Sequence, residues 1–354
     1  MLAALLATTP AIPDEADEAS PRARAEVARW LLHESRWGYI SEFADAAPPA
    51  AGRHVSGGVF SFSDGIVDSQ VPAERSTGRL FFYIMGGGGQ SFNATLTVSE
   101  AALANGTCGF AGTFLDPEDP RCAKLSALGT MTPSAGASAA TGLAALYSRH
   151  PQMRAWPTSH RFVVHELLLR DVWLLDGYGG GVSLQLDDYF SAEPRDSRHG
   201  SRHARLAPAA QHSAAPAAWP APAAAGAWIV AQAQLARTLL PIDASPAATK
   251  TGAAMLGAAG APGATPCQRA RWLAYHSTWS ALTTRSVARG GAPWGNVRSV
   301  ADGLGSNSTG RLFLYLPTPD PSAADIRADP RCALTLSAAS LPPALGAAGG
   351  RAEG

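Results

Sequence analysis

Alternating hydrophobic and polar positions predict a series of β-strands in the first half of the chain. In 59–63 two phenylalanines alternate with serines, and 79–85 and 93–99 show the same period of two. Segments 37–43 and 123–131 are apolar stretches of strand length. The predicted strands are Trp37–Phe43, Val59–Ser63, Arg79–Met85, Asn93–Ser99 and Ala123–Met131.

Two segments show the spacing of amphipathic helices instead. Arg22–Glu34 follows Ser20 and Pro21, a residue pair typical of a helix N-terminus. Ser138–His150 places its large apolar residues on one side. Because the strands before it follow one another without a helix between them, we expect an antiparallel sheet that closes on itself.

The segment 149–181 predicts the strands that close this barrel. His160–Leu169 and Val172–Leu175 are predicted as a strand pair, separated by the polar Arg170–Asp171 and ended by a glycine-rich stretch. Apolar residues occupy both odd and even positions of these strands, so we expect both faces of the sheet to be covered there.

After an alanine- and proline-rich stretch, the chain repeats its first half. Ala28–Trp37 returns as Ala270–Trp279, and Ser76–Tyr83 returns as Ser308–Tyr315. The repeat has no counterpart of 149–181, so we interpret it as a truncated barrel that should not fold well alone. The predicted segments are 1–21, a clipped signal-like or disordered N-terminus; 22–192, a complete barrel; 193–266, a linker; 267–340, an incomplete second barrel; and 341–354, a disordered tail.

The charge balance argues against two classes of partner. With 28 basic and 28 acidic residues the net charge is zero, which is atypical of proteins that bind nucleic acid or anionic membranes. The apolar N-terminal run, 1–8, is too short to span a bilayer. We therefore expect no nucleic-acid partner and no membrane span.

Asparagine and cysteine positions favour the secretory route. Three of the four asparagines, Asn93, Asn105 and Asn307, stand in N-x-S/T sequons, which predicts glycosylation. Cys108 and Cys122 flank a loop rich in glycine and proline that a disulfide would close, although two free thiols are the alternative. No cysteine or histidine has the spacing of a metal site.

Seven short segments of the first half carry a family resemblance: Ala28–Leu31, Ser63–Gly65, Asp116–Cys122, Leu128–Met131, Arg149–Met153, Trp156–Pro157 and Trp173–Gly180. Through these segments the chain resembles the CREG family, secreted glycoproteins built on the split β-barrel of the pyridoxamine-phosphate oxidases. It implies a mainly β fold of the split-barrel type with flanking helices, a homodimer, and a secretory or endolysosomal location. It also implies kinship with members that have lost the flavin site of the wider superfamily.

A flavin site is therefore the main chemical question. In the superfamily, basic side chains on the second strand and after the third hold the FMN phosphate, which needs charged donors. Here the second strand offers only the hydroxyls of Ser61 and Ser63, Arg79 is the nearby cation, and the loop Gly86–Gly89 carries no charge. We expect these residues to be the FMN ligands if FMN binds at all, and binding no tighter than about 10 μM.

No serine in the chain stands in the glycine elbow that surrounds the nucleophile of a serine hydrolase. Two functions remain. The first is a non-catalytic secreted or endolysosomal glycoprotein that acts as a dimeric binding scaffold. The alternative is an oxidoreductase that binds FMN or haem.

Overall fold

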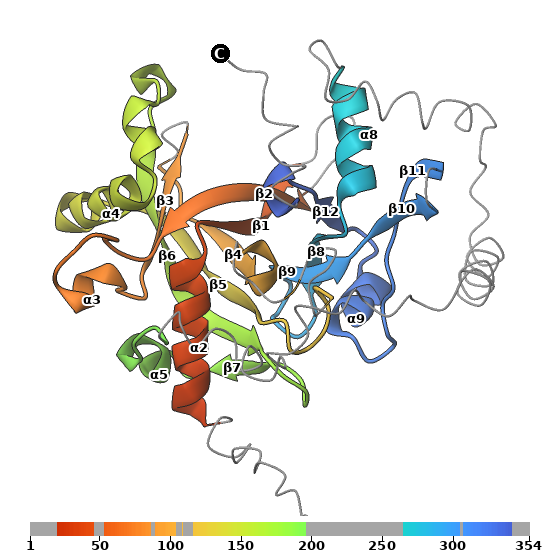
Figure 1. The fold of residues 1–354 in the computed structure, drawn as a ribbon, viewed down its shortest axis with the longest axis horizontal. Helices are drawn as coiled ribbons and strands as arrows, with labels where there is room; N and C mark the ends of the chain where they lie inside the picture. The colour runs from red at the N-terminus through yellow and green to blue at the C-terminus, as the bar shows by residue number, and fades with distance from the viewer. Residues whose placement is uncertain are drawn as a thin grey trace, which may run out of the picture.

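The computed structural model describes residues 20–45, 53–85, 89–103, 108, 116–195, 265–304 and 307–341. The predictions for 1–19, for 196–264 and for 342–354 lie outside these residues. Two units stand side by side in Figure 1, a barrel formed by the first half of the chain and a smaller sheet formed by the second half.

The first unit is a seven-stranded antiparallel sheet that closes on itself, as the sequence predicts. Its order is β3-β2-β1-β4-β5-β6-β7, and an additional pairing of β3 with β6 closes the ring. The strands are β1 (Trp37–Asp45), β2 (Arg53–Ser63), β3 (Leu80–Ile84), β4 (Phe92–Ser99), β5 (Lys124–Pro133), β6 (Val163–Leu175) and β7 (Val182–Leu184).

The closing strand β6 differs from the prediction in one respect. The sequence predicts two strands separated at Arg170–Asp171, but the structure has one strand of 13 residues. Leu169 lies opposite Gly129 and Asp171 lies opposite Leu128, so the extra residue, Arg170, is accommodated as a bulge. His160, predicted to begin the strand, lies in a short 3-10 helix instead.

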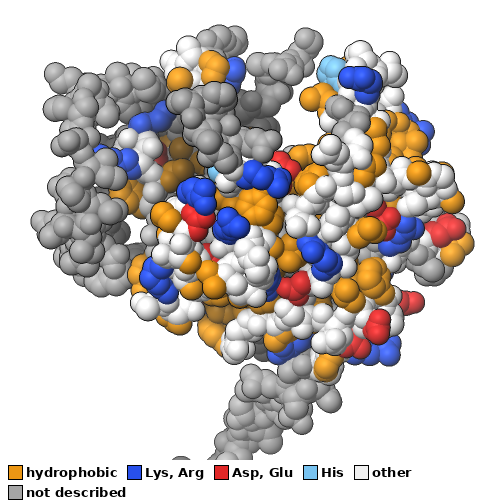
Figure 2. Space-filling view, turned by 180° about the vertical axis from the view of Figure 1, so that it is seen from behind, with side chains coloured by type: hydrophobic (Ala, Val, Ile, Leu, Met, Phe, Trp, Pro, Cys, Tyr) orange, Lys and Arg blue, Asp and Glu red, His pale blue; other side chains and the backbone are white. Residues whose placement is uncertain are grey.

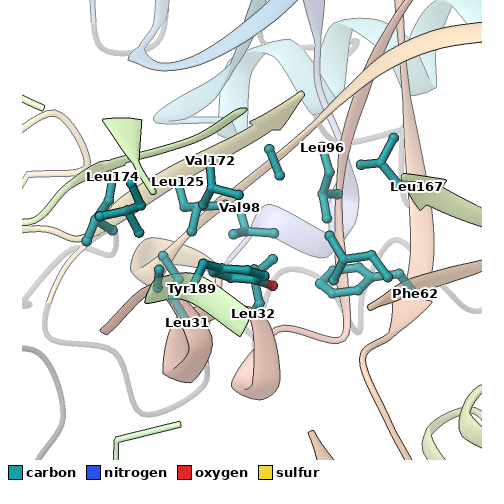
Figure 3. Close-up of a cluster of buried hydrophobic side chains, with 14 of the residues drawn as sticks. Leu31, Leu32, Phe62, Leu96, Val98, Leu125, Leu167, Val172, Leu174 and Tyr189 are labelled. Carbon is teal, nitrogen blue, oxygen red and sulfur yellow. The ribbon is translucent and has the colours of Figure 1, made fainter. Parts of the chain in front are cut away.

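Helices cover this barrel on two sides. They are α2 (Pro21–Glu34), α3 (Pro72–Arg75), α4 (Gly136–Arg149) and α5 (Leu186–Ser191), with the short 3-10 helices η1 (Glu100–Ala102), η2 (Pro151–Ala155) and η3 (Thr158–His160). Figure 3 shows Leu31 and Leu32 of α2 and Tyr189 of α5 pointing toward apolar strand residues such as Leu125. On the other side α4 packs against β3 and β6 through a second apolar cluster that contains Leu146.

The second unit repeats the middle of the first barrel. It consists of α8 (Pro266–His276), β8 (Trp279–Ser286), β9 (Ala292–Ser299), the hairpin β10 (Ala301–Leu304) and β11 (Asn307–Phe313), α9 (Pro321–Ala328), β12 (Ala333–Thr335) and η7 (Ala338–Ser340). Strands β12, β8 and β9 form a sheet in that order, which corresponds to β4, β1 and β2.

The strand registers of the two sheets are also equivalent. Trp279 pairs with Ser299 as Trp37 pairs with Ser61. β1 likewise pairs with β4 as β8 pairs with β12, at matching positions of the sequence repeat. Within the described residues this unit has no counterpart of β5 and β6, so the repeat is an incomplete barrel, as the sequence predicts.

The incomplete unit packs against the complete one. Strands β8 and β9 lie on the face of the barrel formed by β1, β4 and β5, and residues from both units share one buried cluster that includes Tyr39 and Trp279. Among the described residues, no helix is long and apolar enough to cross a membrane.

Candidate functional site

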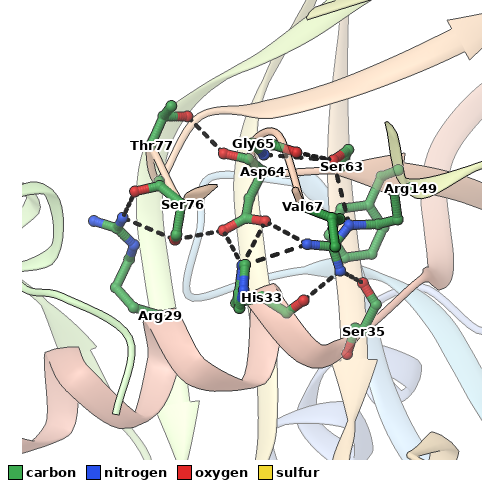
Figure 4. Close-up of polar contacts among 12 residues, drawn as sticks. Arg29, His33, Ser35, Ser63, Asp64, Gly65, Val67, Ser76, Thr77 and Arg149 are labelled. Atoms are coloured by element: carbon green, nitrogen blue, oxygen red, sulfur yellow. Dashed lines mark hydrogen bonds and ion pairs between the residues drawn. The ribbon is translucent and has the colours of Figure 1, made fainter. Parts of the chain in front are cut away.

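Three of the motifs that carry the family resemblance meet in one buried polar cluster. We define this polar cluster as Arg29 and His33 of α2, Asp64 at the end of β2, Ser76, and Arg149 at the end of α4 (Figure 4). Its members lie between positions 29 and 149 of the sequence and come together only in the folded barrel.

Asp64 stands at the centre of this polar cluster. Its side chain is 1% exposed, and Oδ1 lies 3.0 Å from Nη2 of Arg149 and 3.1 Å from Nδ1 of His33. The hydroxyl of Ser76 donates to Oδ2 at 2.5 Å. Three side chains from three different segments therefore hold the carboxylate in place.

The two arginines connect this carboxylate to the surrounding backbone. Arg149 donates to the carbonyl oxygen of His33 and, through Nε, to the hydroxyl of Ser63 at 3.3 Å. Arg29 donates through Nη2 to the carbonyl oxygen of Ser76 at 2.6 Å and through Nη1 to that of Ala192 at 2.9 Å. The cluster thus ties α2 to the β2–β3 connection, to the end of α4 and to the segment after α5.

Electrostatics keep Asp64 ionised in spite of its burial. Burial by itself raises the pKa of this carboxyl, but the hydrogen bond and charge of His33, the charge of Arg149 and the hydroxyl of Ser76 together lower the pKa below its ordinary value. Burial lowers the pKa of Arg149. A paired carboxylate and guanidinium are the arrangement that allows charges inside a protein.

This geometry suits stabilisation better than catalysis. A general base has to reach the proton that it removes, yet Asp64 is sealed from solvent and its oxygens already accept three side-chain donors. Strongly perturbed pKa values often mark active sites, but structural ion-pair networks produce them as well. We assign the polar cluster the role of holding the helices to the barrel.

The residues expected to hold FMN are engaged in other contacts. Arg79 makes a bidentate ion pair with Glu166, with Nε to Oε1 at 2.7 Å and Nη2 to Oε2 at 2.6 Å. Nη2 also donates to the hydroxyl of Ser138 at 2.6 Å. A phosphate would have to replace a carboxylate that already neutralises this guanidinium.

The two serines of β2 contribute little to a phosphate site. Ser63 is fully buried, donates its hydroxyl proton to the carbonyl oxygen of Gly65 at 2.8 Å and belongs to the surroundings of the polar cluster. Ser61 is half-buried opposite Trp37. Most of the loop 86–89 lies outside the described residues. The described side chains therefore do not fit the phosphate of FMN.

Glu166 is the residue that sequence reasoning missed at this position. It is the acidic residue within the apolar run 162–169, and such an isolated charge indicates a partner on a neighbouring element. Glu166 pairs in register with Phe81, two residues after Arg79, so the two charged side chains are diagonal neighbours across β3 and β6.

The predicted modification sites have different surroundings. Asn93 is exposed on β4, and its Oδ1 accepts a hydrogen bond from Arg170 at 2.9 Å. Asn105 and the side chain of Asn307 lie outside the described residues. Cys108 and Cys122 form a disulfide.

The part of the chain that the structure describes holds no set of metal ligands, and one of its faces carries charges of both signs. No group of three or more histidine, cysteine, aspartate or glutamate side chains is arranged to hold a metal ion there. Figure 2 shows one face of the molecule, on which Lys and Arg side chains lie among Asp and Glu side chains. This mixture agrees with the zero net charge.

Solved structures with a similar chain path share little sequence with this protein. A haem binding protein from Mycobacterium smegmatis matches with a TM-score of 0.33 and 13% identity, over 48% of this chain and 61% of that chain. A protein of unknown function from Agrobacterium tumefaciens matches with a TM-score of 0.32 and 16% identity, over 51% and 63%. At these scores the matches carry no inference about ligands.

Two relatives share more sequence with this chain than these solved structures do. Protein CREG2 of Mus musculus is 31% identical over 189 residues, which are 49% of this chain and 59% of the relative. Protein CREG1 of Gallus gallus is 31% identical over 180 residues, 49% of this chain and 88% of the relative. The chain thus spans less than two thirds of the mouse CREG2 that it matches.

The family comparison covers both units. The family model described as "CREG, beta-barrel" matches residues 19–191 and again residues 264–345, which together are well over half of the chain. The two matches coincide with the complete barrel and with its incomplete repeat. The chain belongs to the CREG β-barrel family.

Proposed function

We propose that this protein is a non-catalytic CREG-like glycoprotein of the secretory route or the endolysosomal lumen, and that it acts as a binding scaffold built from paired CREG units. The observation that carries the proposal is the ion pair of Arg79 with Glu166. Arg79 is the cation that the superfamily pose would require for the phosphate, and its guanidinium already has an acidic partner.

Two further observations support the scaffold function. Asp64 and Arg149, the ion pair at the centre of the polar cluster, are closed to solvent, so neither group is available to a substrate. The three sequons and the disulfide between Cys108 and Cys122 are typical of a protein that passes through an oxidising compartment.

A titration with FMN tests this proposal. Transfer of a phosphate dianion from water without charged partners costs several kcal/mol, so we expect no binding tighter than about 10 μM, or roughly −7 kcal/mol. Isothermal titration calorimetry on the full chain measures this affinity, and an absorption spectrum of the purified protein detects any flavin or haem that remains bound.

Two variants separate the possible outcomes. Arg79→Ala should leave the weak FMN affinity unchanged. Glu166→Gln, which frees the Arg79 guanidinium, is the matched variant in which any latent phosphate site would gain affinity. Sub-micromolar binding by the unmodified chain, lost in Arg79→Ala and increased in Glu166→Gln, would refute the proposal and support a flavoprotein.

A further inference from the structure

The contacts between the two units are reciprocal. The register of the sheets makes Ser41 equivalent to Thr283, because each lies four residues after the tryptophan that begins its first strand. The hydroxyl groups of these equivalent residues lie 2.7 Å apart, and both residues are fully buried. A contact between equivalent positions is what a two-fold axis produces.

The glycines on either side of this contact show the same relation. A Cβ atom on Gly57 would collide with the hydroxyl of Thr335, and a Cβ atom on Gly295 would collide with the hydroxyl of Thr97. Gly57 and Gly295 are equivalent in the repeat, and so are Thr97 and Thr335. Residue i of one unit therefore contacts residue j of the other, and residue j contacts residue i, as in an isologous dimer.

Contacts outside this central region join the same two surfaces. The hydroxyl of Thr95 donates to the carbonyl oxygen of Pro293 at 2.5 Å. The hydroxyl of Ser126 donates to the carbonyl oxygen of Gly295 at 2.7 Å. Arg289 pairs with Asp171 at 2.8 Å, beside the bulge of β6. The face formed by β1, β4 and β5 is consequently buried against the second unit and hydrogen-bonded to it.

We propose that residues 266–341 act as a built-in second subunit, which covers within one chain the barrel face that a second copy would otherwise cover. The protein is then a monomer with the interface of a dimer. The homodimer that the family resemblance implies would not form through this face, because the face is already occupied. This proposal does not depend on the absence of a flavin.

Cysteine cross-linking at the two-fold position tests the proposal in the full chain. The exposed thiols are first removed by Cys267→Ser and Cys332→Ser, so that they give no background. In this background Ser41→Cys together with Thr283→Cys should form a disulfide on mild oxidation. The product should migrate as a single chain on a non-reducing gel, and peptide mapping should join the two positions.

The single variants are the matched controls, and they distinguish the alternatives. In a homodimer through this face, Ser41 of one copy would lie against Ser41 of the other, so Ser41→Cys alone would give a cross-linked dimer. The proposal expects a free thiol in that variant and in Thr283→Cys alone. A dimer band from Ser41→Cys alone, or two unreacted thiols in the folded double variant, would overturn the proposal.

Light scattering gives a readout that needs no substitution. The unmodified chain should have the mass of one copy, 36.5 kDa, at micromolar concentration. Twice that mass would show that the second unit does not replace a partner and would contradict the proposal, even if the cysteine variants failed to fold.

Discussion

Removal of the negative charge of Asp64 should destabilise the protein strongly, because it leaves the buried guanidinium of Arg149 without its ion-pair partner. The carboxylate is 1% exposed and the guanidinium 5% exposed, so Asp64→Asn leaves a buried cation without a counter-charge. Loss of one partner from a buried pair costs about 3–5 kcal/mol. Because a typical domain is stable by only about 5–15 kcal/mol, this loss would be a large part of the total.

Urea unfolding at neutral pH, followed by tryptophan fluorescence, measures the loss in the free energy of unfolding. The matched control is Glu26→Gln, which breaks the exposed pair of Arg22 with Glu26 on the same helix. Exposed helical pairs of this kind contribute about 0.3–0.5 kcal/mol, so the control should be close to the unmodified protein.

A double-mutant cycle tests the electrostatic reasoning itself. Asp64→Asn and Arg149→Met should each be costly, but the double variant should cost clearly less than the sum, because it leaves no unpaired charge behind. Additive effects, or a loss below about 1 kcal/mol for Asp64→Asn, would show that the polar cluster does not stabilise the fold through its charges.

Four further predictions concern pH, modification and the disulfide. The depressed pKa of Asp64 means that its contribution to stability is present above the ordinary aspartate pKa of about 3.9 and is lost as the pH falls through the lower folded value; Asp64→Asn should reduce this acid-side slope in unfolding measured across pH. Burial lowers the pKa of Lys124 to about 8, below its unfolded value of about 10.4, so stability should rise across that interval, and Lys124→Met should remove the rise. After expression in a secretory host, Asn93→Gln should remove one glycan that a glycosidase shift detects, whereas Asn296→Gln, outside any sequon, should remove none. Replacement of both Cys108 and Cys122 by serine should cost about 3 kcal/mol in unfolding free energy, and an unchanged stability would contradict the role of the disulfide.

Local periodicity explains why so much of the barrel is predictable from sequence. The strands with a period of two were found, because the alternation reflects which side faces the core, although β2 (Arg53–Ser63) begins six residues before the predicted start at Val59. The bulge at Arg170 was not predictable, since a polar residue within an apolar run looks the same whether the strand ends there or bulges. Only the pairing with β5 shows whether the strand ends at Arg170 or continues through a bulge.

The polar cluster was not predicted as a site, although three of its residues stand in motifs that the sequence analysis quotes. Arg29, Asp64 and Arg149 lie within the motifs that carry the family resemblance, yet nothing local indicates that they form a single cluster. The pairing of Arg79 with Glu166 depends in the same way on the register of β3 with β6. Such contacts are fixed by topology, which a single sequence does not display.

The interface between the two units shows where hydrophobic patterning fails for a physical reason. On β4 the pattern assigns Leu96 to the core and Thr95 and Thr97 to solvent. Leu96 is in the core, but Thr95 and Thr97 are equally buried, because the second unit covers them. Hydrogen bonding such as that of the Thr95 hydroxyl to Pro293 satisfies these side chains without water. A small polar residue can thus face either water or a close-packed, hydrogen-bonded neighbour, and the hydrophobic pattern alone cannot distinguish these two surroundings. The repeat in the sequence, read together with the strand register, does distinguish them.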